Sequence, residues 1–132
     1  MRLLMPLLFC ILFVAGCTTA NSYPPDFKAG SHTVDSLRTT YKCEAIEFEN
    51  WDDNDLTDST LTIGLINSEA FNQMPDESQS EQLSLIGTAV KNSLQHPERY
   101  KTYYVIFMKR SGRFLFEGTV HTYGGELSAG SL

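Results

Sequence analysis

The sequence predicts an α+β fold: a four-stranded, mainly antiparallel sheet in the order strand, strand, helix, strand, strand, with one amphipathic helix packed on a face. Three segments carry this prediction. Residues 60–67 are rich in β-branched residues, residues 83–94 have a helical aliphatic stripe, and residues 103–108 are apolar on both parities. With 132 residues, 42% hydrophobic and 20% charged, the chain has room for one globular domain.

The first two strands are predicted over residues 37–49 and 60–67. In the earlier segment, strand-favouring residues alternate with polar ones and then change parity, which suggests a bulge. These residues are Leu37, Thr39, Tyr41, Cys43, Ile46 and Phe48. Residues 51–59 are rich in Asp and Asn and predict a long turn, so the two strands should pair as a hairpin.

The helix is predicted from aliphatic residues that recur at spacings of three and four. These are Leu83, Ile86, Val90 and Leu94. Ser78 and Glu81 have the spacing of a capping box at its start, and Pro97 closes the far end. A single apolar stripe needs a larger surface to pack against, and the adjacent strands provide one.

The last third of the chain predicts two more strands. Residues 103–108 should form a central strand, residues 109–113 a charged turn and residues 114–123 a returning strand. Residues 124–132 are small and polar and predict a flexible tail. Residues 17–36 are polar, contain Pro and Gly, and predict a flexible tether, which leaves a single α+β domain at residues 37–123.

Residues 1–16 have the pattern of an export signal. Arg2 supplies a positive charge, and residues 3–15 form an apolar run interrupted by Pro6. A membrane-spanning helix needs about 20 apolar residues, and the residues that follow Cys17 are polar. The segment is therefore expected to be removed, which leaves 116 residues in the mature chain.

The run Val14-Ala15-Gly16-Cys17 resembles the lipobox of bacterial lipoprotein precursors. The resemblance covers only residues 1–17 and implies that Cys17 receives a diacylglycerol and that a peptidase cuts between Gly16 and Cys17. Two or three acyl chains would hold the protein firmly on a membrane. Because Thr18 rather than Asp follows the cysteine, we expect the outer membrane, facing the periplasm, if the source is a diderm bacterium.

Cysteine usage is consistent with this expectation. Cys10 leaves with the signal and Cys17 is lipidated, so no disulfide within the mature chain is expected. Cys43 stands in an apolar run, which favours a small buried hydrophobe over a reactive or intermolecular thiol.

Charge is distributed unevenly along the chain. Residues 43–90 contain eleven acidic residues and no Lys or Arg, whereas residues 91–132 contain six basic and three acidic residues. Removing Arg2 with the signal leaves nine basic residues against sixteen acidic ones, a net charge of −7. This charge argues against nucleic acid or anionic lipid as a ligand. A solvated acidic surface is the favoured interpretation of this asymmetry. A docking surface for a basic partner remains the alternative.

The densest acidic cluster spans residues 52–58, and its candidate metal ligands are Asp53, Asp55 and Asp58. An EF-hand counted from Asp53 would need Gly and Glu where Asp58 and Gly64 stand, so we expect neither a metal site nor a cofactor. The order Asp53-Asn54-Asp55-Leu56-Thr57 also resembles the nucleophile motif of haloacid-dehalogenase-type phosphatases. That family requires a parallel Rossmann-like sheet, which the predicted element order lacks.

The sequence assigns no catalytic residue. The three histidines, His32, His96 and His121, fall in separate segments, and no Gly-x-Ser-x-Gly elbow occurs. The C-terminal strands mix aromatic and basic side chains, a combination that can bind sugars or peptides, although a packed core beside a basic turn is favoured. These residues are Tyr100, Tyr103, Tyr104, Phe107, Phe114, Phe116 and Tyr123, with Lys101, Lys109, Arg110 and Arg113.

The preferred functional interpretation is a membrane-anchored, non-enzymatic interaction module. Its expected partners are membrane lipid, through acylated Cys17, and an envelope protein or cell-wall component. Two alternatives remain: a small envelope hydrolase that uses the carboxylates of residues 52–58, and an acidic inhibitor of a cell-wall hydrolase.

Overall fold

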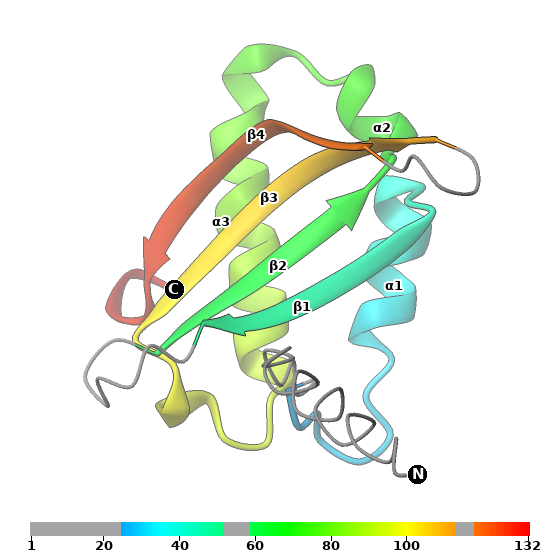
Figure 1. The fold of residues 1–132 in the computed structure, drawn as a ribbon. Coiled ribbons are helices and arrows are strands. Elements are labelled where there is room, and N and C mark those ends of the chain that lie inside the picture. The colour runs from blue at the N-terminus through cyan, green and yellow to red at the C-terminus, as the bar shows by residue number, and fades with distance from the viewer. Residues whose placement is uncertain (1–24, 52–58, 113–117) are drawn as a thin grey trace, which may run out of the picture.

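A computed structural model describes residues 25–51, 59–112 and 118–132, which are coloured in Figure 1. Its elements are, in chain order, α1 (Thr33–Tyr41), β1 (Ala45–Trp51), β2 (Thr60–Ile66), α2 (Glu69–Asn72), α3 (Asp76–Ser93), β3 (Thr102–Ser111) and β4 (Gly118–Ser128). Short 3-10 turns occupy Pro97–Arg99 and Ala129–Ser131. The predicted α+β class is confirmed.

The four strands form one sheet in the order β1-β2-β3-β4. The outer pairs β1–β2 and β3–β4 are antiparallel, but the central pair β2–β3 is parallel, so the sheet is mixed. Parallel neighbours need a crossover of a dozen or more residues. The segment between β2 and β3, which contains α2 and α3, provides that crossover and so sets the parallel pairing.

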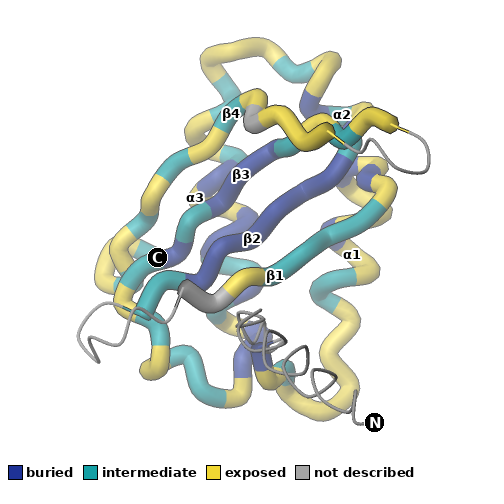
Figure 2. The backbone as a smooth tube through the Cα atoms, in the orientation of Figure 1, coloured by how far each residue is buried: buried dark blue, intermediate teal, exposed yellow. Residues whose placement is uncertain are grey.

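Helices α1 and α3 lie behind the sheet, on the same face (Figure 1). The two central strands are buried along most of their length, and the edge strands are more exposed (Figure 2). Alternate residues of β2 and β3 point into the layer between sheet and helices and are at most 1% exposed. They are Leu61, Ile63, Leu65, Tyr103, Val105 and Phe107. The opposite face of the sheet, which these helices leave uncovered, is called the open face below.

Helix α3 confirms the predicted helix, and Leu83, Ile86 and Val90 form its buried stripe. The predicted capping box is wrong, because the helix begins one turn earlier, at Asp76, and Ser78 lies inside it. Pro75 occupies the N-cap with an extended backbone and no side-chain cap, and the two acidic residues that follow it favour the first turn of a helix.

The strand predicted from residue 37 is wrong over its first half, because Thr33–Tyr41 is helix α1. Leu37 and Tyr41 are four residues apart, so they share a helix face as well as a strand face, and both are buried. Lys42 ends the helix in the left-handed conformation, with φ of 50°. The strand itself begins at Ala45.

The domain also extends beyond the predicted boundaries of residues 37 and 123. Phe27 forms an antiparallel bridge with Leu94, inside the segment assigned to the tether. At the other end, β4 continues to Ser128, into the segment assigned to the tail. A Cβ at Gly125 would lie 2.8 Å from Leu83 Cδ1, so the missing side chain lets α3 pack directly on the strand.

Among the described residues, the hydrophobic core and the partly buried residues at its margin lie between Phe27 and Leu132. A fragment that begins at Tyr23 retains all of these core residues and is used below for measurements of stability and binding.

Candidate functional site

Several residues proposed from the sequence lie outside the described residues. They are the lipidation and cleavage residues Gly16 and Cys17, and the acidic cluster with Asp53, Asp55 and Asp58. The three histidines lie apart in the chain: His32 precedes α1, and His121 is on β4. The Nδ1 atom of His96 lies 3.0 Å from Glu98 Oε1. Among residues 25–51, 59–112 and 118–132, no three His, Cys, Asp or Glu side chains form a group that could hold a metal ion.

Cys43 lies in the turn between α1 and β1 and is 8% exposed. Burial raises the pKa of its thiol, and a hydrogen bond with Ser68 offsets part of that shift. A raised pKa disfavours the thiolate, which is the reactive form. The position thus agrees with the small buried hydrophobe expected from the sequence.

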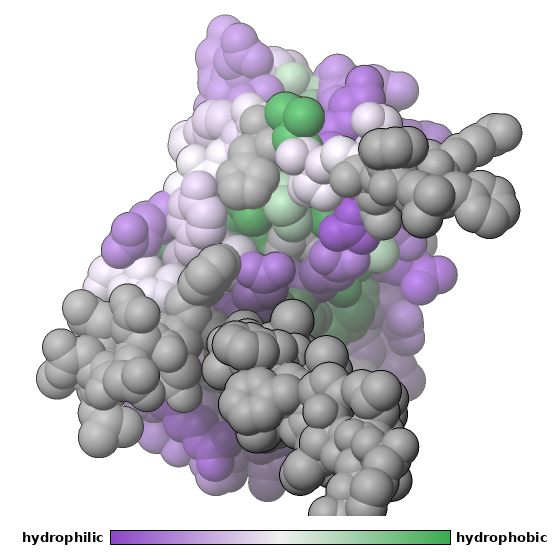
Figure 3. Space-filling model, in the orientation of Figure 1, coloured by the Kyte–Doolittle hydropathy of each residue, from purple (hydrophilic) through white to green (hydrophobic). Residues whose placement is uncertain are grey.

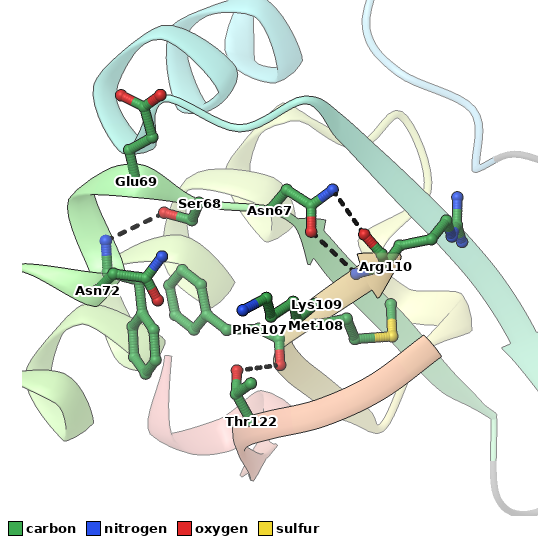
Figure 4. Close-up of a pocket in the computed structure, with 10 residues that line it drawn as sticks. Asn67, Ser68, Glu69, Asn72, Phe107, Met108, Lys109, Arg110 and Thr122 are labelled. Atoms are coloured by element: carbon green, nitrogen blue, oxygen red, sulfur yellow. Dashed lines mark hydrogen bonds between the residues drawn. The ribbon is translucent and has the colours of Figure 1, made fainter. Parts of the chain in front are cut away.

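One cavity, of about 360 Å³, lies at the carboxyl end of β3 beside α2 and is called the strand-end cavity (Figure 4). Its lining comprises Asn67, Ser68, Glu69, Phe71, Asn72, Phe107, Met108, Lys109, Arg110 and Thr122. Phe71 and Phe107 are buried and stack with ring centroids 4.1 Å apart. Lys109 extends from β3 toward α2 (Figure 4), so polar side chains surround a rigid aromatic base.

Asn67 fixes the geometry of this strand end. It follows β2 in the left-handed conformation, with φ of 52°. Its side-chain amide pairs with the backbone of Arg110, accepting from N–H at 2.8 Å and donating to the carbonyl at 3.1 Å (Figure 4). Its own backbone N–H donates to Met108 at 2.9 Å. The side chain thus continues the β2–β3 pairing for one more residue.

Replacing Asn67 with alanine is expected to lower the free energy of unfolding by about 2–4 kcal/mol. The change removes the side-chain oxygen that accepts from Arg110 N–H. It also leaves alanine in the left-handed conformation with no side-chain hydrogen bond to offset the strain. Asn67→Gly should be about 1 kcal/mol less destabilising, because glycine adopts this conformation freely. Urea unfolding of the fragment from Tyr23 measures both values.

The matched control is Asn92→Ala, an exposed asparagine on α3 whose change should stay within about 0.5 kcal/mol. If Asn67→Ala and Asn92→Ala had equal effects, the structural role assigned to the Asn67 amide would be wrong.

Arg110 spans the sheet to Glu47 in a two-point ion pair. Its Nη1 and Nη2 atoms donate to Glu47 Oε1 and Oε2 at 2.6 and 2.7 Å. The guanidinium also approaches Thr119 Oγ1 on β4, at 3.4 Å. Hydrogen bonds from Arg110 lower the pKa of the Glu47 carboxyl, and partial burial opposes them. The pair joins β1 to β3 across the open face.

We expect this ion pair to make the stability of the domain depend on pH in the acidic range. Because the folded-state pKa of Glu47 is depressed, its contribution is present above the unfolded pKa of about 4.5 and is lost as pH falls through the folded pKa. At neutral pH, Glu47→Gln should lower stability by at most about 1 kcal/mol, because both side chains remain partly exposed. Melting temperatures of both proteins from neutral pH down to about pH 3 test this: the curves should converge in acid.

Glu81→Gln, at an exposed position on α3, serves as the control and should follow the unmodified protein throughout. A difference between Glu47→Gln and the unmodified protein that stays constant down to the lowest pH would contradict the role given to Glu47.

A second cavity, of about 420 Å³, lies on the open face and is called the open-face cavity. Its lining comprises Glu47, Glu49, Thr62, Gly64, Tyr104, Ile106, Met108, Arg110 and Thr119. Figure 3 views this side and shows hydrophobic surface between hydrophilic residues, beside the part that grey atoms cover. All four strands contribute to the cavity, and Arg110 borders both cavities.

The strand register explains why the open face is hollow. One cross-strand row places Glu47, Gly64, Ile106 and Gly124 side by side. The two glycines present no side chain on either side of Ile106, and the Met108 side chain covers Gly64. The next row is formed by Glu49, Thr62, Tyr104 and Glu126, and is called the acidic row.

The sequence interpretation identified only part of this arrangement. The sequence pattern groups Tyr104 with Lys109 and Arg110, and predicts that the aromatic residues of this group belong to the core. Tyr103 and Phe107 are indeed buried, but Tyr104 lies on the open face and is only partly buried. Glu47 and Glu49 were missed, although their alternation with Ile46 and Phe48 is the signal of a strand with one polar face.

No family model matches the sequence, and no curated protein or solved structure is significantly similar to it. Within the described parts of the chain, no helix is long and apolar enough to cross a membrane.

Proposed function

We propose that this chain is a membrane-anchored envelope lipoprotein, lipidated at Cys17, whose folded domain is a non-enzymatic binding module for an envelope protein or cell-wall component. The proposed residence is the outer membrane, facing the periplasm, in a diderm source. The observation that carries the binding role is the open face. Helices α1 and α3 cover one side of the sheet, and the other side has a cavity lined by residues from every strand.

The chemistry of the open face supports recognition of a larger partner. Its cavity combines an apolar base, formed by Ile106 and Met108, with polar groups at the margin. Partner surfaces are commonly recognised by one buried anchor surrounded by polar contacts. Binding at this face requires no conformational change, because the sheet supplies a preformed surface.

The test is an affinity capture from detergent-solubilised envelope with the lipidated protein, read by mass spectrometry, together with cosedimentation on purified cell-wall sacculi. The control carries residues 1–24 fused to an unrelated folded domain, so it reports binding through the lipid and the segment that follows it. We expect one protein or the sacculi to be enriched with the full chain and not with the control. Equal recovery in both samples would reject a binding role for the domain.

A further inference from the structure

Among the described residues, the open face has a surplus of negative charge. Glu47 is neutralised by Arg110 at 2.6 Å, but Glu49 and Glu126 form no ion pair within the described residues. Both lie in the acidic row, at its two ends, on strands β1 and β4. A cation that enters between them would meet uncompensated carboxylates.

Thr62, in the middle of the same row, provides an independent observation. Thr62 is 9% exposed and lines the open-face cavity. In the described part of the chain, its hydroxyl has no hydrogen-bond partner. Buried hydroxyl groups are normally paired, so this one is available to a bound group.

We infer that the open-face cavity receives the side chain of an arginine or lysine presented by a protein partner. Ile106 and Met108 suit the methylene stem of such a side chain, and its cationic head would lie between Glu49, Thr62 and Tyr104. Tyr104 offers an aromatic ring to the cation, an interaction that an arginine guanidinium makes well. The partner is a protein because a single layer of sheet forms the base of the cavity. Such a surface can seat one anchoring side chain and leaves a small free ligand largely exposed.

This inference rests on the proposed function and names the chemistry of its partner. The test is an NMR titration of the ¹⁵N-labelled fragment from Tyr23 with the capped peptide Gly-Ser-Arg-Ser-Gly. A lysine peptide and a peptide with neutral citrulline in place of arginine run in parallel. We expect saturable shifts at Glu49, Thr62 and Tyr104 with the two cationic peptides, and none with citrulline. Equal shifts with citrulline, or none with arginine and lysine at millimolar peptide, would overturn the inference.

Two variants separate binding from folding. Thr62→Val keeps the side-chain shape but removes the hydroxyl, so the melting temperature should hold or rise while peptide affinity falls about fivefold. Glu49→Gln should also weaken binding about fivefold, and Glu81→Gln on α3 should leave affinity unchanged. Unaltered affinity in both Thr62→Val and Glu49→Gln would overturn the inference.

The remaining outcomes distinguish the inference from the proposed function. Shifts at the acidic row caused only by muropeptides, or only by raising the concentration of the fragment itself, would overturn the inference in favour of a cell-wall ligand or a second copy. If envelope capture by the full chain survives Thr62→Val and Glu49→Gln, the inference fails and the binding function stands. If the full chain captures nothing beyond its control, the binding function itself fails.

Discussion

Phe107→Ala is expected to lower the free energy of unfolding by about 3–5 kcal/mol, the largest loss we anticipate for one side chain in the domain. Phe107 is 1% exposed at the centre of β3. Its ring stacks on Phe71 at 4.1 Å and meets Tyr41 edge-on at 5.9 Å. The change therefore removes contacts with α1, α2 and the sheet together and leaves a void that close-packed neighbours cannot fill.

Urea unfolding of the fragment from Tyr23 measures this loss. Phe107→Leu retains most of the volume and should cost clearly less. Leu85→Ala removes an aliphatic side chain that is 53% exposed on α3, so it should change stability by no more than about 0.5 kcal/mol. A Phe107→Ala loss no greater than that of Leu85→Ala would refute the assigned packing, and complete unfolding of Phe107→Ala alone would agree with it.

How well the sequence predicted each element depended on whether its pattern fits a single period. The stripe of α3 fits only a helix, whereas the apolar run of β3 is short and rich in aromatic and β-branched residues, which favour a strand. Leu37 and Tyr41, by contrast, fit both periods. What decides for α1 is that the helix buries both residues in the core, where Tyr41 meets Phe107 of β3 edge-on, and that is a tertiary effect.

Glycine misled the prediction of the last strand. Gly124 and Gly125 indicate a chain break when judged locally, yet β4 runs through both of them. A Cβ at Gly124 would lie 3.0 Å from the Val105 carbonyl oxygen, and one at Gly125 would meet Leu83 on α3. The glycines are there because neighbouring elements come close, and that information is absent from a local pattern.

The candidate site was harder to predict than the fold because its residues come from four strands. Glu49, Thr62, Tyr104 and Glu126 become neighbours only through the register of the sheet. The parallel β2–β3 pair fixes that register, and an antiparallel arrangement would bring other residues together. The acidic bias of residues 43–90 was visible in the sequence, but which carboxylates share a surface was not.

Cys17→Ala is expected to abolish lipidation completely and to leave the export signal attached. The lipobox resemblance implies both steps at this residue: the thiol would accept the diacylglycerol, and the peptidase would then cut the lipidated chain between Gly16 and Cys17. Without two or three acyl chains, at about 0.8 kcal/mol per buried CH₂, the uncleaved chain would lack its lipid anchor. Metabolic labelling with an acyl-chain probe and intact-mass analysis measure the two effects separately.

The two other cysteines of the chain serve as matched controls, because the lipoprotein proposal expects neither of them to be lipidated. Cys10→Ala changes a residue that leaves with the signal, and Cys43→Ala changes a buried residue of the domain, so both proteins should be labelled and cleaved normally. Loss of label in Cys17→Ala alone would identify the modified sulfur, since that variant still carries the other two cysteine thiols. Label retained by Cys17→Ala, or cleavage of that variant at residue 16, would sink the lipoprotein assignment. The domain would then need another route to the membrane.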